Sequence, residues 1–215
     1  MKNLTTEGTG AQRLAANRVR IVDLLIGTGR EGMDQLVEWL VKEGFFEAPA
    51  STKYHGVYEG GLAQHSLNVL ERLSVMAAAY GMDVPRESLV IACLLHDVCK
   101  VGAYVALPND DCRLPIEYRW NKEQPKGHAA LSIKRIQKFI KLTEIEELMI
   151  KFHMGVYGLN EFEPGKGEYP LRGGGMANAW HHHPIVKLMY FADELATLGE
   201  KGTDVSGKAD GSEPK

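Results

Sequence analysis

The sequence lacks several features that would place it in a special class of proteins. Its 215 residues include only three cysteines, Cys93, Cys99 and Cys112, and none of them forms a CxxC pair. This spacing does not indicate a disulfide framework and is typical of a reducing compartment, so we expect a cytoplasmic protein. No apolar run approaches the roughly 18 residues of a membrane span, and the start of the chain has no apolar signal-peptide core. We therefore expect neither a membrane segment nor secretion.

The chain also lacks an excess of basic residues. Its 25 Lys and Arg side chains are outnumbered by 28 Asp and Glu, which gives a net charge of −3. Extended duplex nucleic acid is bound through a strongly positive surface, so this balance argues against such a partner. A small anionic substrate, attracted by local charge, fits the composition better.

What the sequence does contain is helical periodicity over most of its length. Apolar residues recur at helical spacing, in segments that often end at glycine or begin at proline. The segments that predict helices are 12–26, 34–42, 61–80, 85–98, 128–141, 144–153 and 184–198. Thr143 and Glu146 predict a capping box at the start of segment 144–153. The predicted fold class is therefore an all-α helical bundle.

Two segments break this periodicity. Residues 102–124 hold two short β-prone runs around a turn-rich PNDDC sequence, which predicts a small β-hairpin inserted into the bundle. Residues 155–179 are rich in glycine and poorly periodic, which predicts a long loop of the kind that often carries function. Residues 1–10 and 200–215 hold too little apolar surface to pack. We expect a mobile N-terminus (1–10), one domain (11–199) and a disordered tail (200–215).

Histidine is the residue in excess, with eight in the chain. Several positions place an imidazole or carboxylate in or at the end of an apolar helix: His65, His96-Asp97, His128, His153 and Asp193. Burying such a group without a partner is costly, and imidazoles and carboxylates that converge in a helical bundle are ligands for divalent metals. Taken singly, each histidine is more often a hydrogen-bonded core residue, and an aspartate on a helix is usually solvated. Taken together, they favour a metal site.

These residues resemble, in their order, the H…HD…D motif of the HD-domain metal-dependent phosphohydrolase superfamily. The local sequences match as well: GGLAQHS around His65, LLHDVCK around the doublet and ADELAT around Asp193. His128 in GHAALS and His153 in KFHMG resemble the two further histidines of members that bind two metals. Three further features are similar to the HD module of bacterial 3′→5′ exoribonucleases. They are the sequence KYHGVYEGGL that leads into the first helix of the motif, the Lys three residues after HD, and the GH at the start of segment 128–141. The residues ahead of that module are too few for the OB-fold domain of those enzymes.

The resemblance implies an HD-domain helical bundle, a metal cofactor and a reaction. One divalent ion (Mn, Mg, Fe, Ni, Co or Zn) would be held by His65, His96, Asp97 and Asp193, and a second by His128, His153 and the bridging Asp97. A metal-activated water would then hydrolyse a phosphoester of a nucleotide or short oligonucleotide, as a phosphomonoesterase or phosphodiesterase. Two alternatives stay open. One is a di-iron HD-type oxygenase acting on a small polyol or phosphonate, and the other is a non-catalytic HD binding module.

Further residues have two interpretations each. Lys100 follows Asp97 by one helical turn and is either a catalytic contact to phosphate, acting beside Asp97, or a helix C-terminal lysine. Four more residues either contact substrate or lie in solvent, namely His55, His182, His183 and Arg172. A histidine of the 181–183 run can act as a general acid at neutral pH.

The end of the predicted hairpin is also ambiguous. Tyr118, Arg119 and Trp120 combine aromatic rings with a positive charge, a combination that can stack a nucleotide base beside a phosphate site. The alternative is an amphipathic strand that packs on the bundle.

Overall fold

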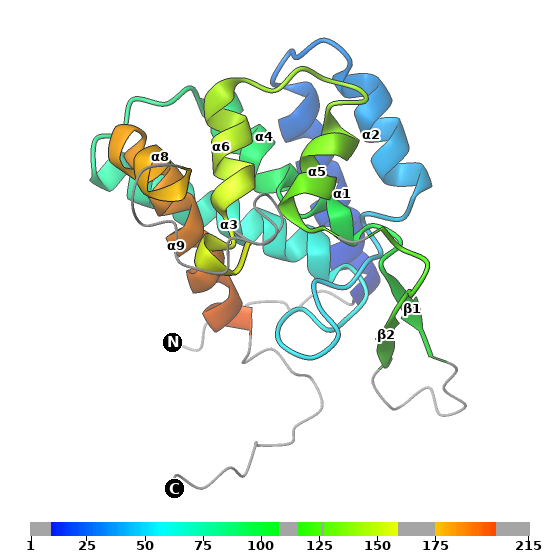
Figure 1. Ribbon diagram of the computed structural model, residues 1–215. Coiled ribbons are helices and arrows are strands. Elements are labelled where there is room, and N and C mark those ends of the chain that lie inside the picture. The colour runs from blue at the N-terminus through cyan, green and yellow to red at the C-terminus, as the bar shows by residue number, and fades with distance from the viewer. Residues whose placement is uncertain (1–9, 108–115, 126, 159–174, 201–215) are drawn as a thin grey trace, which may run out of the picture.

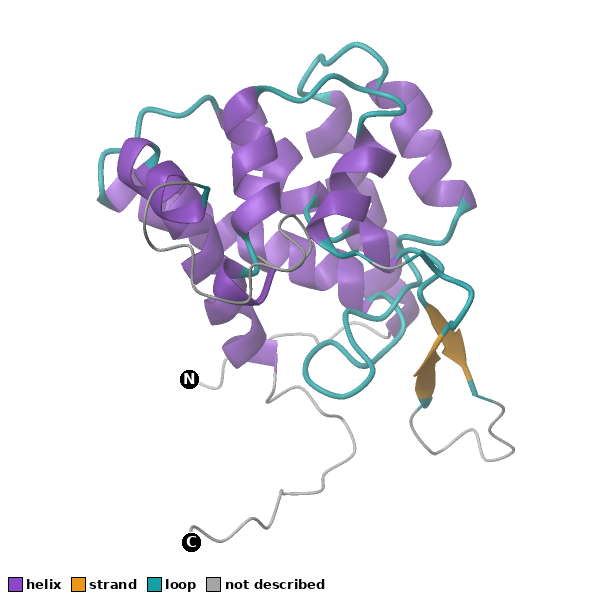
Figure 2. Cartoon of the chain, in the orientation of Figure 1, coloured by secondary structure: helices purple, strands orange, loops and turns teal. Residues whose placement is uncertain are grey.

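The computed structural model describes residues 10–107, 116–125, 127–158 and 175–200 (Figure 1). Helices make up most of this part of the chain, and a two-stranded hairpin projects from one edge (Figure 2). The helices are α1 Gly10–Ile26, α2 Met33–Lys42, α3 Gly61–Ala79, α4 Arg86–Leu95, α5 Ala129–Ile136, α6 Glu144–Phe152, α8 Met176–His182 and α9 Pro184–Glu200. Two short 3-10 helices, η1 and η2, span Val98–Lys100 and Gly155–Gly158. The predicted all-α bundle with a small hairpin is confirmed.

Helix α4 lies at the centre of the bundle. From Leu89 to Leu95 its sequence is apolar on all sides, and every residue from Ser88 to Leu95 is buried. A helix without a polar face is stable only when other helices surround it. It packs against α3, α6 and α1, while α9 packs along both α3 and α6. The end of α4 therefore lies in the interior, among the ends of neighbouring helices.

Glu146 joins α6 to the loop after α1 and to the start of α4. Its carboxylate accepts two hydrogen bonds from Arg30, at 3.0 and 2.7 Å, and one of 2.8 Å from the Ser88 hydroxyl. The predicted capping box is also present, because Thr143 N–H donates to Glu146 at 2.9 Å and the Thr143 hydroxyl accepts from Glu146 N–H. Burial by itself would raise the pKa of Glu146, but these donors outweigh it and hold the pKa below its usual value.

The hairpin consists of β1, Tyr104–Ala106, paired antiparallel with β2, Tyr118–Trp120. Its predicted PNDDC turn lies outside the described residues. Cys93 and Cys99 are buried free thiols, and Cys112 also lies outside the described residues. In the part of the chain that is described, no helix has the length and apolar character needed to cross a membrane.

Several boundaries differ from the predictions. Helix α4 ends at Leu95 rather than at residue 98, and α5 ends at Ile136 rather than at residue 141. Residues 176–179, predicted as loop, begin helix α8, and 159–174 of the same predicted loop are outside the described residues. Helix α9 includes Glu200, predicted to lie in the disordered tail, because its side chain is buried in contact with α3. The rest of that tail and residues 1–9 of the predicted mobile N-terminus lie outside the described residues.

Candidate metal centre

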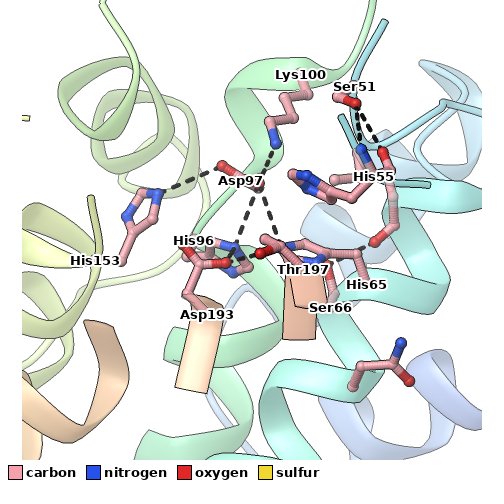
Figure 3. A network of polar contacts seen from close by, with 12 residues as sticks. Ser51, His55, His65, Ser66, His96, Asp97, Lys100, His153, Asp193 and Thr197 are labelled. Atoms are coloured by element: carbon pink, nitrogen blue, oxygen red, sulfur yellow. Dashed lines mark hydrogen bonds and ion pairs between the residues drawn. The ribbon is translucent and has the colours of Figure 1, made fainter. Parts of the chain in front are cut away.

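Asp97 stands in the middle of a group of imidazoles and carboxylates that are all buried except the half-buried His128 (Figure 3). The group draws on separate helices: His65 comes from α3, His96 and Asp97 from the end of α4, His128 from the start of α5, His153 from the end of α6 and Asp193 from α9. The fold thus brings all six predicted ligands together. We call them the Asp97 cluster.

Helix ends account for most of this convergence. His96 is the C-cap of α4 and His153 the C-cap of α6, and both keep a helical backbone. At Asp97 the backbone leaves the α-helical range, with φ −109° and ψ 17°, and the chain turns into η1. His128 is the N-cap residue of α5. Side chains at helix ends are free to point along the helix axis, so these groups meet in one space.

The two oxygens of Asp97 face different histidines. Its Oδ2 lies 3.4 Å from His96 Nε2 and 3.9 Å from His65 Nε2. Its Oδ1 lies 2.8 Å from His128 Nε2 and 3.5 Å from His153 Nε2. One carboxylate therefore divides the histidines into two pairs.

Asp193 completes the first of these pairs. Its Oδ1 lies 3.0 Å from His65 Nε2 and 3.8 Å from His96 Nε2. The side with His65 and His96 thus has two carboxylates, and the side with His128 and His153 has only the shared Asp97.

The other ring nitrogen of each histidine is engaged outside the cluster. His96 Nδ1 lies 2.8 Å from the Cys93 carbonyl, and His153 Nδ1 lies 2.7 Å from the Ile150 carbonyl. A carbonyl only accepts, so both rings carry their hydrogen on Nδ1, which leaves a lone pair on Nε2 when the ring is neutral. These lone pairs point toward Asp97, as a metal ligand requires.

Several of these inward-facing atoms lack a hydrogen bond. Among the described residues, no group offers a hydrogen bond of acceptable geometry to the Nε2 atoms of His96 and His153, although both are buried, and the inward-facing atoms of His65 and Asp97 have only ion-pair contacts, the closest to Asp193 and His128 respectively. Buried polar atoms without partners are rare in native proteins and call for an explanation. A divalent cation accepts imidazole and carboxylate lone pairs together. The donor set fits such an ion on each side of Asp97.

Neighbouring side chains set the protonation of the ionisable groups in the cluster. Burial by itself would raise the pKa of Asp97, but Lys100, His96 and His128 outweigh it and hold that pKa well below its usual range. Burial would likewise lower the pKa of His65, but carboxylates on both sides of the ring raise it to about 9. Burial dominates at His153 and lowers its pKa. The cluster is therefore built around ionised carboxylates.

Lys100 lies directly over Asp97. Its Nζ is 2.6 Å from Asp97 Oδ2, and the side chain is buried (Figure 3). Burial would lower the pKa of this amine, but the Asp97 carboxylate raises it above its usual value. Lys100 therefore brings a fixed positive charge to the cluster. It belongs to η1 and contacts Asp97 itself, in addition to ending a helix.

His55 lies against the cluster on the loop before α3. Its ring centroid is 4.8 Å from that of His65, and burial, followed by the nearby charge of His65, lowers its pKa to about 4. The loop is held tightly, because the Ser51 hydroxyl bonds the backbone of His55. A Cβ at Gly61 would lie 2.0 Å from the Gly56 carbonyl oxygen, so this approach requires glycine. His55 is thus a neutral imidazole beside the cluster at pH 7.

Comparison with known proteins agrees with this geometry. The sequence model of the family described as "HD domain" matches residues 62–198, which include every residue of the Asp97 cluster. The chain belongs to the HD domain family. No solved structure matches this HD domain significantly.

Two curated proteins are similar to this HD domain. One is a dihydroneopterin 2′,3′-cyclic phosphate phosphodiesterase of Methanocaldococcus jannaschii, 40% identical over 63 residues, which cover 27% of this chain and 25% of that protein. The other is the 3′-5′ exoribonuclease YhaM of Geobacillus sp. (strain WCH70), 25% identical over 158 residues, which cover 71% of this chain and 46% of that protein. The chain therefore spans less than half the length of either relative.

Sequence reasoning missed Glu200. Its carboxylate oxygens lie 3.3 and 3.2 Å from His65 Nδ1, and Asn68 donates to it at 2.7 Å. Glu200 follows Asp193 by seven residues, two helical turns, so both lie on one face of α9. That spacing could have identified Glu200, but the composition of residues 200–215 predicted a disordered tail that includes it. Cys99 was also missed: its Sγ lies 3.1 Å from His128 Nδ1, a contact that no sequence pattern indicates.

Three predicted substrate contacts are not placed at the cluster. His182 ends α8 and is exposed, and His183 follows it. The ring of His182 contacts that of His181, and among the described residues no hydrogen bond or ion pair links His182 or His183 to the Asp97 cluster. Arg172 lies outside the described residues. Of the predicted substrate-binding residues, only His55 and Lys100 are placed beside the cluster.

Proposed function

We propose that this HD domain hydrolyses a phosphodiester of a nucleotide or short oligonucleotide, with divalent metal ions as cofactors. The observation that carries the proposal is the division of the two Asp97 oxygens between two histidine pairs. Both relatives are named for activity on phosphodiesters, one on a cyclic phosphate and one on RNA. These names support the diester over the monoester. The near-neutral charge of the chain supports a small anionic substrate.

The Asp97 cluster supplies the metal ligands in this proposal. One ion would be held on the Oδ2 side of Asp97 by His65, His96 and Asp193. A second ion would be held on the Oδ1 side by His128 and His153. A carboxylate suits the shared position because it has two oxygens, whereas an imidazole has one usable lone pair. Such ions, when bound, lower the pKa of a water and draw charge from a phosphoryl oxygen.

Lys100 and His55 would position the substrate. The Lys100 ammonium lies 2.6 Å from Asp97 Oδ2, so a phosphate held at the cluster comes within its reach. A fixed positive charge there stabilises the negative charge that builds up on the phosphoryl oxygens. His55 is neutral at pH 7 and buries its Nε2 without a hydrogen bond from any described residue. This leaves it able to donate to, or accept from, the substrate.

Glu200 would hold His65 in the orientation that binding requires. A carboxylate that accepts from one ring nitrogen keeps the other nitrogen as the ligand and increases its basicity. The His65–Glu200 contact has this geometry, and both side chains are buried. Asn68 in turn fixes the carboxylate.

Metal reconstitution tests the proposed function. Protein stripped of metal and reloaded separately with Mn, Mg, Co, Ni, Fe or Zn is assayed against cyclic nucleotides and short oligoribonucleotides. Hydrolysis by loaded wild type and its loss in Asp97→Ala support the proposal. A protein that binds two metals and hydrolyses no phosphoester contradicts it. Stoichiometric iron with O₂ consumption would favour the oxygenase instead.

A further inference from the structure

The hairpin carries its aromatic side chains on one face. Tyr104 of β1 stands directly opposite Trp120 of β2, and Val105 stands opposite Arg119. Opposite residues project to the same side of a sheet and successive residues to alternate sides. Tyr104, Trp120 and Tyr118 therefore share one face. Val105 and Arg119 occupy the other, so Arg119 cannot join Trp120 in a common stack.

This aromatic face borders the Asp97 cluster. The Ala103 N–H donates to the Lys100 carbonyl at 2.9 Å, so β1 begins directly after the turn that presents Lys100. Tyr104 is half-buried, and burial raises the pKa of its phenol, while the neighbouring charges of Lys100 and Asp97 act on that pKa in opposite directions. Burial likewise raises the pKa of Tyr118, and the charge of Glu59, on the loop before α3, raises it further. In Figure 1 the hairpin leaves the bundle beside that loop.

Trp120 is positioned as an exposed platform. Its ring meets the Tyr104 ring edge to face, with centroids 5.6 Å apart and an interplanar angle of 76°. The contact supports the indole from one side, yet 49% of Trp120 stays exposed. A tryptophan that serves only packing is mostly buried. An indole held in place with its surface open can stack a planar ring.

We propose that Trp120, supported by Tyr104, stacks the base of the substrate while the phosphate lies at the Asp97 cluster. The inference rests on the proposed function, because the base is placed relative to a phosphate bound there. It narrows the substrate to phosphodiesters whose alcohol carries a planar heterocycle. Stacking accepts every base, so selectivity is expected for the presence of a base and not for its identity.

Binding of a matched pair of phosphates tests the stack. Adenosine 5′-monophosphate and ribose 5-phosphate share a phosphate monoester on ribose and differ in the base, and calorimetry with Mn-loaded protein gives both affinities. Wild type is expected to prefer the nucleotide by about 5- to 150-fold, the usual contribution of one stacked base. Trp120→Ala should remove most of this preference and Trp120→Phe should keep it. Val105→Ala, on the opposite face of the hairpin, is the control and should leave it unchanged.

Equal affinity of wild type for the two phosphates overturns the inference. A folded Trp120→Ala variant that weakens the binding of both phosphates equally also overturns it. So does a Val105→Ala variant that weakens nucleotide binding as much as Trp120→Ala does. Hydrolysis of adenosine 2′,3′-cyclic phosphate and glycerol 1,2-cyclic phosphate separates this inference from the proposed function. If neither of these nor a short oligoribonucleotide is hydrolysed but nucleotide binding depends on Trp120, the hydrolase proposal fails and the stacking proposal stands. If both are hydrolysed equally and independently of Trp120, the hydrolase stands and the stack is wrong.

Discussion

Replacement of Glu200 by glutamine tests the support of His65. The carboxylate lies 3.2 Å from His65 Nδ1 and accepts from Asn68 at 2.7 Å, with little exposure of either His65 or Glu200. Glutamine keeps the size and one acceptor oxygen but removes the charge. Loss of such a partner typically weakens metal binding about 10- to 100-fold, or about 1.4–2.8 kcal/mol. We expect the lower end for Glu200→Gln and the upper end for Glu200→Ala.

The assay is a titration of metal-free protein with Zn²⁺ or Mn²⁺ against a competing chelator, at pH 7 and pH 9. A bound metal displaces any proton on its histidine ligands. Because the pKa of His65 is raised to about 9 in the metal-free protein, wild-type affinity should rise between these pH values. Glu200→Gln removes a charge that favours this proton. The loss of affinity caused by the substitution should therefore be larger at pH 9 than at pH 7.

Glu71→Gln is the matched control, since it makes the same charge change at an exposed position on α3. If Glu200→Gln binds metal as tightly as this control at both pH values, Glu200 does not support the ligand. A loss that is larger at pH 7 than at pH 9 would refute the proton argument alone.

Three further predictions concern the cluster and the bundle. Asp97→Asn should lose metal and activity together, because an amide has only one oxygen and cannot face both histidine pairs with a ligand atom. Elemental analysis and the hydrolysis assay check this, and retained activity would refute the site assignment. Metal at 100 times its Kd should add about 2.7 kcal/mol to the free energy of unfolding and raise Tm by about 5–10 °C. Thermal melts check this, and a chelator should reverse the rise in Tm. Glu146→Gln should lower the free energy of unfolding, measured with denaturant at pH 7, by about 2 kcal/mol. Because the pKa of Glu146 is lowered in the folded state, this difference should shrink as pH falls below about 4.3, and a constant difference would contradict the role of its charge.

Most of the helices could be predicted from the sequence, because helical periodicity and capping residues act over a few neighbours. The Thr143–Glu146 capping box is one such case. The extents of α4 and α5 were overestimated, since apolar runs continue past the point where the chain must turn. For His96 and Asp97 this turn matters, because it moves both groups from the side of a helix to its end.

The sequence by itself determined the family, the helical bundle with its hairpin, and the six residues of the Asp97 cluster, since these depend on residue type, order and short-range spacing. Only the tertiary structure decided which Asp97 oxygen faces which histidines, that Glu200 and Cys99 contact ligand histidines, and that Arg119 and Trp120 lie on opposite faces of the hairpin. These relations are distances between side chains far apart in the sequence or depend on strand register. They are fixed by how the helices and strands pack, which no local pattern encodes.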